Sequence, residues 1–348
     1  MRYECLVLML ALFGLAQAED TEAVILATRR SGTVEVFRAD SLESNGHIQF
    51  GRMAESIEAS PDGRKLIIEG AAAAEPNACC DLFALDLETR KMNRLTGGMH
   101  AVFSPDGSEL YVAWSGIGIV NMSTLERKDR IYELAGDTLY PSPDGHWLFG
   151  LVHWPHAALD VFDLREHKLL RRLPVNAGAG LWLGNRFYLC GQLGSVRTLW
   201  NVTPDMTELG HGTPVLIAGD GGGHALLAAG QRLLLHEVFG GKMDRRSKTE
   251  VIGGAYAIDP STGVVLQQIE PLAHFSTLIA SRDGRELYGL DVPYNHWTDS
   301  TRLLKINLES GTLVAERPLQ PDVWHFTLAA LPKSLVPRGE VQLNPPAR

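Results

Sequence analysis

The sequence predicts an all-β chain that folds as a seven-bladed β-propeller, closed into a ring by strands from both ends of the chain. Two repeated signatures and their spacing lead to this prediction. The first is the turn Ser-Pro-Asp-Gly, which stands at residues 60–63, 104–107 and 142–145, and at 281–284 with arginine in place of proline. Proline presets φ, aspartate bonds back to the backbone and glycine takes the left-handed position, so the turn continues a β-hairpin.

The second signature is a short apolar run that ends in Asp or Asn and is followed by another turn. Its copies end at Asp86, Asn121, Asp163, Asn201, Asp259 and Asn307, and Arg38 fits as a seventh. The intervals between copies range from 35 to 58 residues and average about 45. This is the length of one four-stranded propeller blade, so seven copies fill one domain over residues 19–331.

The remaining strands are placed by register. Turns at Gly184-Asn185 and Gly230-Gln231 stand where the fifth and sixth blades need them. The first blade begins at residues 23–27 and lacks an inner strand, which residues 326–331 are expected to supply, so that no sheet edge is left open. Residues 332–348 contain four prolines and are expected to form a disordered tail.

The first 18 residues have the pattern of a signal peptide. One cation at Arg2 precedes an apolar run at residues 5–15, and Ala16-Gln17-Ala18 is a cleavage pattern. The run is about half of the roughly 20 residues that span a bilayer, and no later segment is longer, so no membrane span is expected. The mature protein is therefore predicted to be periplasmic or secreted.

Composition excludes several function classes. The chain has 32 Lys plus Arg against 41 Asp plus Glu, a net charge of −9 that does not favour nucleic acid. Its 45% hydrophobic and 21% charged residues are typical of a globular protein. The sequence has no nucleophile elbow, phosphate-binding loop, zinc-protease or haem-attachment motif, so no catalytic residue is identifiable in this chain.

A binding face is expected where the longest loops leave the ring together. Blades share one orientation, so the insertions at residues 70–80, 153–158, 237–254 and 291–301 lie on the same side. Aromatic and imidazole side chains there suit a partner protein or a small amine or aromatic ligand, although each tryptophan has the alternative of packing on its own blade. The predicted binding residues are His153, Trp154, His156, His236, Arg245, Arg246, Lys248, Tyr294, His296 and Trp297.

Histidine and cysteine spacing leaves two smaller questions. His153 and His156 lack a visible third ligand, so no metal site is predicted. Cys79 and Cys80 are adjacent, and they form either a vicinal disulfide or two free thiols. Cys190 lies three blades away, too far for a bridge to either, and is expected to be a buried thiol.

From Phe187 onward the sequence resembles the heavy subunit of periplasmic amine dehydrogenases of the methylamine and aromatic amine type, within the YVTN-like seven-bladed propellers. The most specific part is Arg246-Ser247-Lys248-Thr249 leading into residues 258–263. The other matching residues are 187–190, 194–195, His274, Ser276, 281–283, 287–288 and 309–311. The family has a disulfide partner shortly before the position of Cys190, where this chain has none.

The resemblance implies a platform for a small light subunit that carries tryptophan tryptophylquinone. The propeller then forms part of the substrate channel for oxidative deamination of primary amines, and electrons leave to a small copper protein or a cytochrome. No cofactor is expected in this chain. Two alternatives stay open: a non-enzymatic exported propeller that binds a protein or envelope ligand, and a metal-dependent lactonase-like hydrolase.

Overall fold

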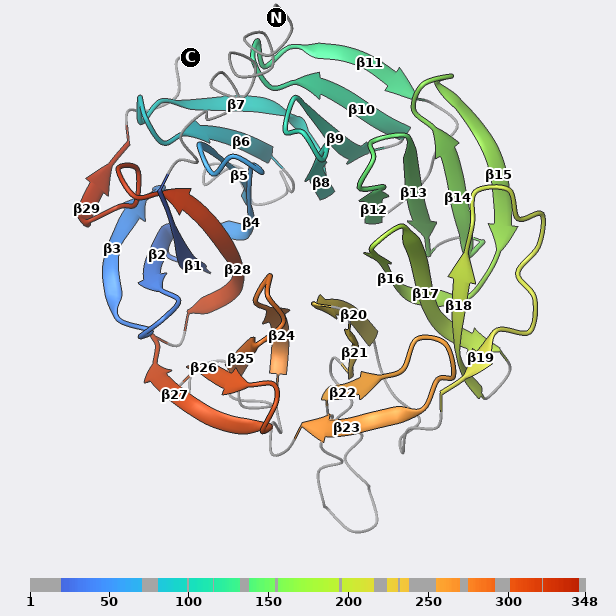
Figure 1. Ribbon diagram of the computed structural model, residues 1–348. Coiled ribbons are helices and arrows are strands. Elements are labelled where there is room, and N and C mark those ends of the chain that lie inside the picture. Colours follow the sequence, from blue (N-terminus) through green and yellow to red (C-terminus); the bar gives the residue numbers. More distant parts are fainter. Residues whose placement is uncertain are drawn as a thin grey trace, which may run out of the picture.

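The structure is a computed structural model that describes most of the chain and contains only β-strands as regular elements. It describes residues 20–70, 81–98, 100–114, 116–131, 138–153, 156–193, 196–215, 224–230, 232–237, 255–269, 275–291, 301–320 and 322–343. Seven sheets follow one another around a central axis (Figure 1). The predicted seven-bladed β-propeller is confirmed. Within the described ranges no helix is long and apolar enough to cross a bilayer.

Each blade has four antiparallel strands, counted outward from the axis. The first strands are β28 (Val323–Pro332), β4 (Ala54–Ala59), β8 (His100–Phe103), β12 (Thr138–Pro141), β16 (Ala177–Leu183), β20 (His224–Ala229) and β24 (Phe275–Ala280). The second strands are β1 (Thr21–Arg29), β5 (Lys65–Gly70), β9 (Glu109–Trp114), β13 (Trp147–Val152), β17 (Arg186–Leu193), β21 (Arg232–Glu237) and β25 (Glu286–Asp291).

The outer half of each blade completes the sheet. The third strands are β2 (Thr33–Arg38), β6 (Asp81–Asp86), β10 (Gly116–Asn121), β14 (Ala158–Asp163), β18 (Val196–Val202), β22 (Ala255–Ile258) and β26 (Arg302–Asn307). The outermost strands are β3 (Ser44–Gln49), β7 (Met92–Gly97), β11 (Arg127–Ile131), β15 (Lys168–Pro174), β19 (Thr213–Pro214), β23 (Val265–Ile269) and β27 (Thr312–Pro318).

The two ends of the chain meet in the first blade, as expected. Strand β28 pairs antiparallel with β1, and Leu328 lies opposite Ile25. Figure 1 shows the red β28 beside the dark blue β1. The first blade is thus built from both ends, and folding it requires contacts between the most distant parts of the sequence.

The prediction of a disordered tail is wrong for residues 333–343. Strand β29 (Gly339–Gln342) pairs in parallel with β3, so the first sheet has five strands. Val336 is 5% exposed and belongs to the core of the first two blades. A Cβ on Gly46 would overlap the Gly339 backbone, so glycine at 46 permits this close pairing. Proline content indicated disorder, but apolar residues between the prolines pack against the blade.

The Ser-Pro-Asp-Gly turns have the geometry that their residues predict. In the first copy Ser60 Oγ donates to Asp62 Oδ1 at 2.5 Å and accepts from the Lys65 amide at 2.9 Å. Asp62 Oδ1 also accepts from the Arg64 amide at 3.1 Å. Gly63 has a φ of 67°, and a Cβ there would overlap the carbonyl oxygen of Ala330. These turns join the first strand to the second, on what we name the turn face.

The second signature caps the turn between the third and fourth strands. Asp86 Oδ1 accepts from the amide of Thr89 at 2.8 Å, and Asn121, Asp163, Asp259 and Asn307 act in the same way. Four residues after each of these five capping residues, and four residues after Arg38, the chain has a positive φ. The residues at this position are Leu42, Arg90, Leu125, His167, Gly263 and Gly311.

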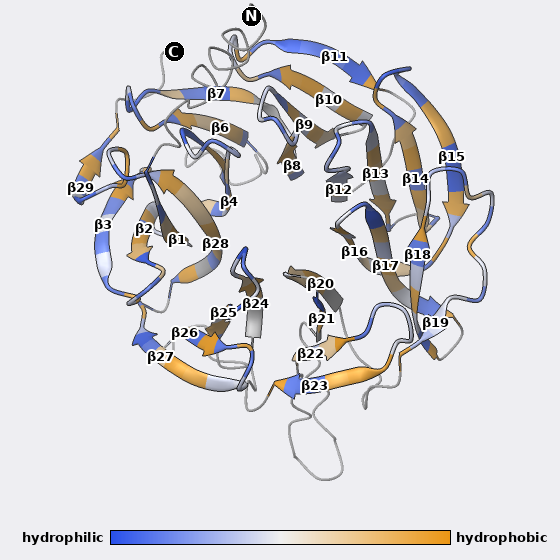
Figure 2. Ribbon diagram, viewed as in Figure 1, coloured by the Kyte–Doolittle hydropathy of each residue, from blue (hydrophilic) through white to orange (hydrophobic). Residues whose placement is uncertain are grey.

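The hydrophobic core consists of clusters between neighbouring blades, because each sheet buries both of its faces. Val24, Phe83 and Leu331 belong to one such cluster and are not exposed. At the rim, strand β11 is largely hydrophilic in Figure 2 and β15 has both hydrophilic and hydrophobic residues, and charged residues of this kind protect open sheet edges. Strands β23 and β27 differ, since Val264, Leu266, Leu313 and Val314 are about half exposed.

Candidate functional site

The predicted binding residues lie mostly outside the described part of the chain. Those outside are Trp154, Arg245, Arg246, Lys248, Tyr294, His296 and Trp297, and the possible vicinal disulfide of Cys79 and Cys80 also lies outside the described residues. His153 and His156 are exposed and flank the connection between β13 and β14. The backbone of His236 is placed in β21, two blades further on. His153 and His156 lie in a second-to-third-strand connection, and His236 lies near the end of a second strand, on the side opposite the turn face, which we name the loop face. The structure does not bring the three into one site.

Among the described residues no group of three or more His, Cys, Asp and Glu side chains is arranged to hold a metal ion. Cys190 is free and fully buried in β17, as predicted. Burial raises the pKa of its thiol to about 12, although Arg197 acts in the opposite direction. A thiol held protonated in this way is chemically inert at neutral pH.

A cavity near the axis is a better candidate for a ligand site, because polar and titratable side chains line it. It has a volume of about 440 Å³ and lies between the inner strands β4 and β28, next to the first turn. Its polar lining includes Glu58, Ser60, His325 and Thr327. The cavity is of the size that small-molecule sites have in proteins. We name it the axial cavity.

Glu58 is the only acidic side chain among the described residues that line the axial cavity. Burial raises the pKa of its carboxyl to about 7, and a hydrogen bond from the Phe103 backbone opposes this shift. Among the residues that the structure describes, no cation acts on it, so the carboxyl is close to half ionised at neutral pH. A buried carboxylate without a positive partner is costly, which is why its proton is retained.

His325 lies on β28 and lines the same cavity. Burial lowers the pKa of its imidazole to about 4, so the ring is neutral at physiological pH. Its Nδ1 is buried and has no hydrogen-bond partner among the described residues. His100, at the start of β8 in the third blade, has the same orphaned Nδ1 and a pKa lowered by burial. Buried polar atoms are normally satisfied, so an orphaned one in a cavity marks a place for a ligand or water.

A second carboxyl group with a raised pKa lies in the same blade as Glu58. Burial raises the pKa of Glu69, on β5, to about 7, while a hydrogen bond from Ser56 lowers it and the charge of Glu55 raises it. The Ser56 Oγ donates to Glu69 Oε2 at 2.9 Å. The second blade therefore holds two carboxyl groups that titrate near neutral pH.

The sequence contained a signal for Glu58 that was not used. It stands two residues before the serine of its turn, and the same position holds Val102, Tyr140 and Ile279 in the other copies. A carboxyl at a position that is otherwise apolar or aromatic indicates a special role. His325 had no such signal, because its strand is assigned to the first blade only by ring closure.

Comparison with known proteins identifies the fold alone. No family model and no curated protein matches the sequence. Among solved structures, the chain is similar to dihydro-heme d1 dehydrogenase NirN in complex with DHE, with a TM-score of 0.59 and 14% identity over 88% of this chain and 75% of that one. It is also similar to hydrazine synthase from Kuenenia stuttgartiensis, with a TM-score of 0.56 and 14% identity over 81% and 96%.

A candidate 6-phosphogluconolactonase from Bacteroides fragilis gives a TM-score of 0.60 with 11% identity, over 90% of this chain and 99% of that one. Identities this low establish the architecture and not the chemistry. The chain is therefore a β-propeller protein. The amine dehydrogenase family has no support from these comparisons at the level of sequence.

Proposed function

We propose that this protein is an exported propeller that binds a small primary amine as its cation in the axial cavity. The more specific form of the proposal is that it serves as the heavy-subunit platform of a periplasmic amine dehydrogenase. The catalytic quinone then belongs to a small light subunit, and a copper protein or cytochrome accepts the electrons. Export after residue 18 and the absence of a cofactor in this chain are parts of the same proposal.

The observation that carries the proposal is the unpaired carboxyl of Glu58 in a cavity of ligand size. The described residues of the cavity supply no positive charge, because the imidazole of His325 is held neutral by burial. An ammonium group that enters would supply the missing charge and stabilise the ionised carboxylate. Charge-assisted hydrogen bonds of this kind are about twice as strong as neutral ones.

Two further groups suit the same ligand. An ammonium group has three donors, and the orphaned Nδ1 of His325 is able to accept one of them in its unprotonated tautomer. The Thr327 hydroxyl is a further acceptor in the lining. Acceptors without competing donors favour an ammonium ligand over a carboxylate ligand.

Proton balance gives the proposal a measurable sign. Glu58 must lose its proton before it pairs with the ammonium, so binding near pH 6.5 releases a fraction of a proton. Affinity therefore rises between about pH 5.5 and pH 7.5 and levels off above the pKa of Glu58, which is about 7.

The test is calorimetric titration of the mature chain with methylamine and 2-phenylethylamine, each in two buffers of different ionisation enthalpy. We expect binding with proton release, and loss of both in Glu58→Gln. Glu309→Gln, an exposed turn residue, is the matched control. Equal binding by Glu58→Gln, or equal binding of 2-phenylethanol, which has no charge, refutes the amine site.

The dehydrogenase form of the proposal has its own test. The protein is purified from its native host under conditions that preserve complexes, and its absorption spectrum and amine-dependent dye reduction are measured. A quinone-absorbing small chain that co-purifies supports it. A colourless protein without dye reduction refutes this form and leaves the calorimetric test of the amine site unaffected.

A second candidate function is a propeller that binds a protein partner without catalysis. The exposed apolar side chains on the rim of the sixth and seventh blades favour it, namely Val264, Leu266, Leu313 and Val314. Gly311, just before β27, lies against the Gln267 side chain of β23, so the sixth and seventh blades meet at this part of the rim. Replacing Leu266 and Val314 together by serine would abolish capture of the partner and leave amine binding unchanged.

A further inference from the structure

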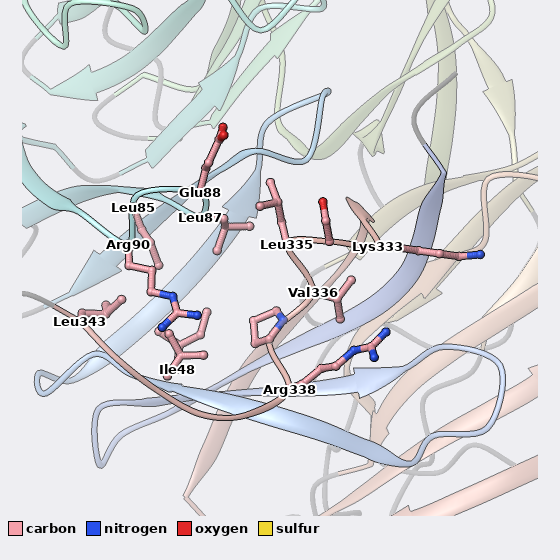
Figure 3. Close-up of a pocket in the computed structure, with 13 residues that line it drawn as sticks. Ile48, Leu85, Leu87, Glu88, Arg90, Lys333, Leu335, Val336, Arg338 and Leu343 are labelled. Carbon is pink, nitrogen blue, oxygen red and sulfur yellow. The ribbon is translucent and has the colours of Figure 1, made fainter. Parts of the chain in front are cut away.

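A second cavity lies on the outer side of the first two blades, away from the axial cavity. Its volume is about 490 Å³, and the segment at residues 333–343 forms one of its walls. Figure 3 shows this cavity with its lining side chains. We name it the rim pocket. Eight of its lining residues are apolar, namely Ile48, Leu85, Leu87, Leu335, Val336, Pro337, Val341 and Leu343. Of these, Leu335, Val341 and Leu343 are half-buried, and the others are buried in the fold.

Four charged residues line the rim pocket, and two of them are already paired. Glu88 Oε2 accepts from Arg64 Nη1 at 3.1 Å, and Lys333 Nζ is 2.8 Å from Asp20 Oδ2. Arg90 and Arg338 have no partner among the described residues. The pocket therefore carries an uncompensated positive charge, which is complementary to an anion.

Figure 3 shows that the charged side chains of the rim pocket point in different directions. The Arg90 guanidinium extends between Ile48 and Leu343, whereas Glu88 and Lys333 point away from it. Arg338 lies at the other end, near Val336. Arg90 is thus the cation that faces the apolar walls.

The backbone of Arg90 provides an independent observation. Its φ is 56°, in the left-handed region that only glycine adopts without strain. The equivalent turns of the sixth and seventh blades have Gly263 and Gly311 at this position. Arg90 therefore has a side chain at a position where two of the other blades have glycine.

The other side chains at this position have a structural reason. Leu42 is 1% exposed and packs in the core, and Leu125 packs against the core between the second and third blades. His167 Nδ1 is 2.8 Å from Asp129 Oδ2 in the neighbouring blade. Arg90 is exposed and has neither packing in a core cluster nor an ion pair among the described residues. A strained backbone conformation that no packing or ion pair explains points to a functional role for the residue.

We infer that the rim pocket binds an organic monocarboxylate with an unbranched alkyl chain. Arg90 would pair with the carboxylate through two parallel N–H donors, and the chain would lie against Leu335, Val341 and Leu343, the half-buried apolar side chains of the lining. A guanidinium matches the planar carboxylate, and its weak hydration favours such a partly buried pair. A cavity of about 490 Å³ is within the range of small-molecule sites.

The test is calorimetric titration with octanoate, octan-1-ol and octylamine, with acetate as the head group alone. We expect octanoate to bind best, octan-1-ol and acetate to bind at least about tenfold more weakly, and octylammonium not to bind. Octan-1-ol binding as well as octanoate overturns the assignment of the charge.

Two substitutions locate the site. Arg90→Gln retains the strained backbone and Arg90→Gly removes it, and each should weaken octanoate at least about tenfold. Arg186→Gln, which removes an exposed arginine of the fifth blade, should leave the affinity unchanged. Octanoate binding that survives in Arg90→Gln overturns the proposal.

The melting temperature distinguishes a binding role for Arg90 from a structural one, because the two roles predict changes of opposite sign in Arg90→Gly. Arg90→Gly should raise it by about 2 °C because strain is relieved, whereas Leu125→Gly should lower it because packing is lost. Arg90→Gly that melts lower than the natural chain shows that the side chain supports the fold, and this overturns the inference.

Discussion

Replacing Glu58 with glutamine should stabilise the protein, and the gain should grow as the pH rises. Glutamine has nearly the same shape and no charge, so it removes the need to ionise a group inside the axial cavity. The pKa of Glu58 is raised by burial from 4.5 to about 7 in the folded chain. A raised carboxyl pKa means that the folded state holds the proton more tightly than the unfolded state.

The sign follows from this linkage. Below pH 4.5 Glu58 is protonated in both the folded and the unfolded state of the natural protein, so its ionisation does not lower the folding stability there. Between pH 4.5 and about 7 the unfolded state releases its proton first, so folding stability falls as the pH rises. Glutamine does not titrate between pH 4.5 and about 7, so the variant does not lose folding stability in this range.

The magnitude follows from the size of the pKa difference. At 1.36 kcal/mol for each pH unit, the difference between 4.5 and about 7 corresponds to about 3 kcal/mol above pH 8. Glu58 is half-buried and retains contact with water, so we expect about 2 kcal/mol. Contributions of Glu69 and His325 are common to both proteins and cancel in the difference.

The assay is urea unfolding of both proteins from pH 4.5 to pH 8.5, followed by circular dichroism. Equal stability at pH 4.5 and a gain of about 2 kcal/mol for Glu58→Gln at pH 8 are expected. The control Glu309→Gln should stay within about 0.5 kcal/mol of the natural protein. A Glu58→Gln variant that is less stable at pH 8 would show that the carboxylate is paired in solution, and the reasoning for an amine site would fail with it.

Three further predictions concern the scaffold. Gly63→Ala should lower stability by at least about 3 kcal/mol, since φ is 67° and the Cβ meets the Ala330 carbonyl, whereas Gly184→Ala, with open space, should cost about 1 kcal/mol in the same thermal melt; equal losses would contradict the packing of the turn. In a Cys79→Ser, Cys80→Ser background, Cys190 should react with a disulfide reagent at pH 8 only after unfolding, because burial raises its pKa to about 12, and rapid labelling of the folded chain would disprove this. Deleting residues 333–348 should lower the melting temperature and promote self-association in size-exclusion chromatography, because it uncovers the edge of β3; an unchanged monomer would show that β29 is dispensable.

Local chemistry made the propeller predictable. Each Ser-Pro-Asp-Gly turn is stabilised by hydrogen bonds within six residues, such as the one between Ser60 and Lys65. The turn therefore forms in the same way wherever it stands in the chain. The capping aspartates and asparagines act over three residues, as in Asp86 and Thr89. Ring closure by residues 326–331 followed from the need to leave no open edge.

The candidate sites were less predictable, because they depend on segments far apart in sequence. Glu58 and His325 line the same cavity only because the last inner strand closes the first blade. Arg90 and Leu343 meet only because residues 333–343 return to the rim. Neither pair has a spacing that a motif describes, and the loops chosen from sequence lie largely outside the described residues.

By itself, the sequence determined the repeat, the blade length and the turn geometry, since these depend on backbone preferences and hydrogen bonds between near neighbours. The tertiary structure alone decided the charge states of Glu58 and His325, because a pKa depends on how much water and which charges surround a group after the blades have packed. It also decided that the C-terminal segment is a fifth strand and a pocket wall, since edge pairing depends on which strand remains uncovered once the ring is closed.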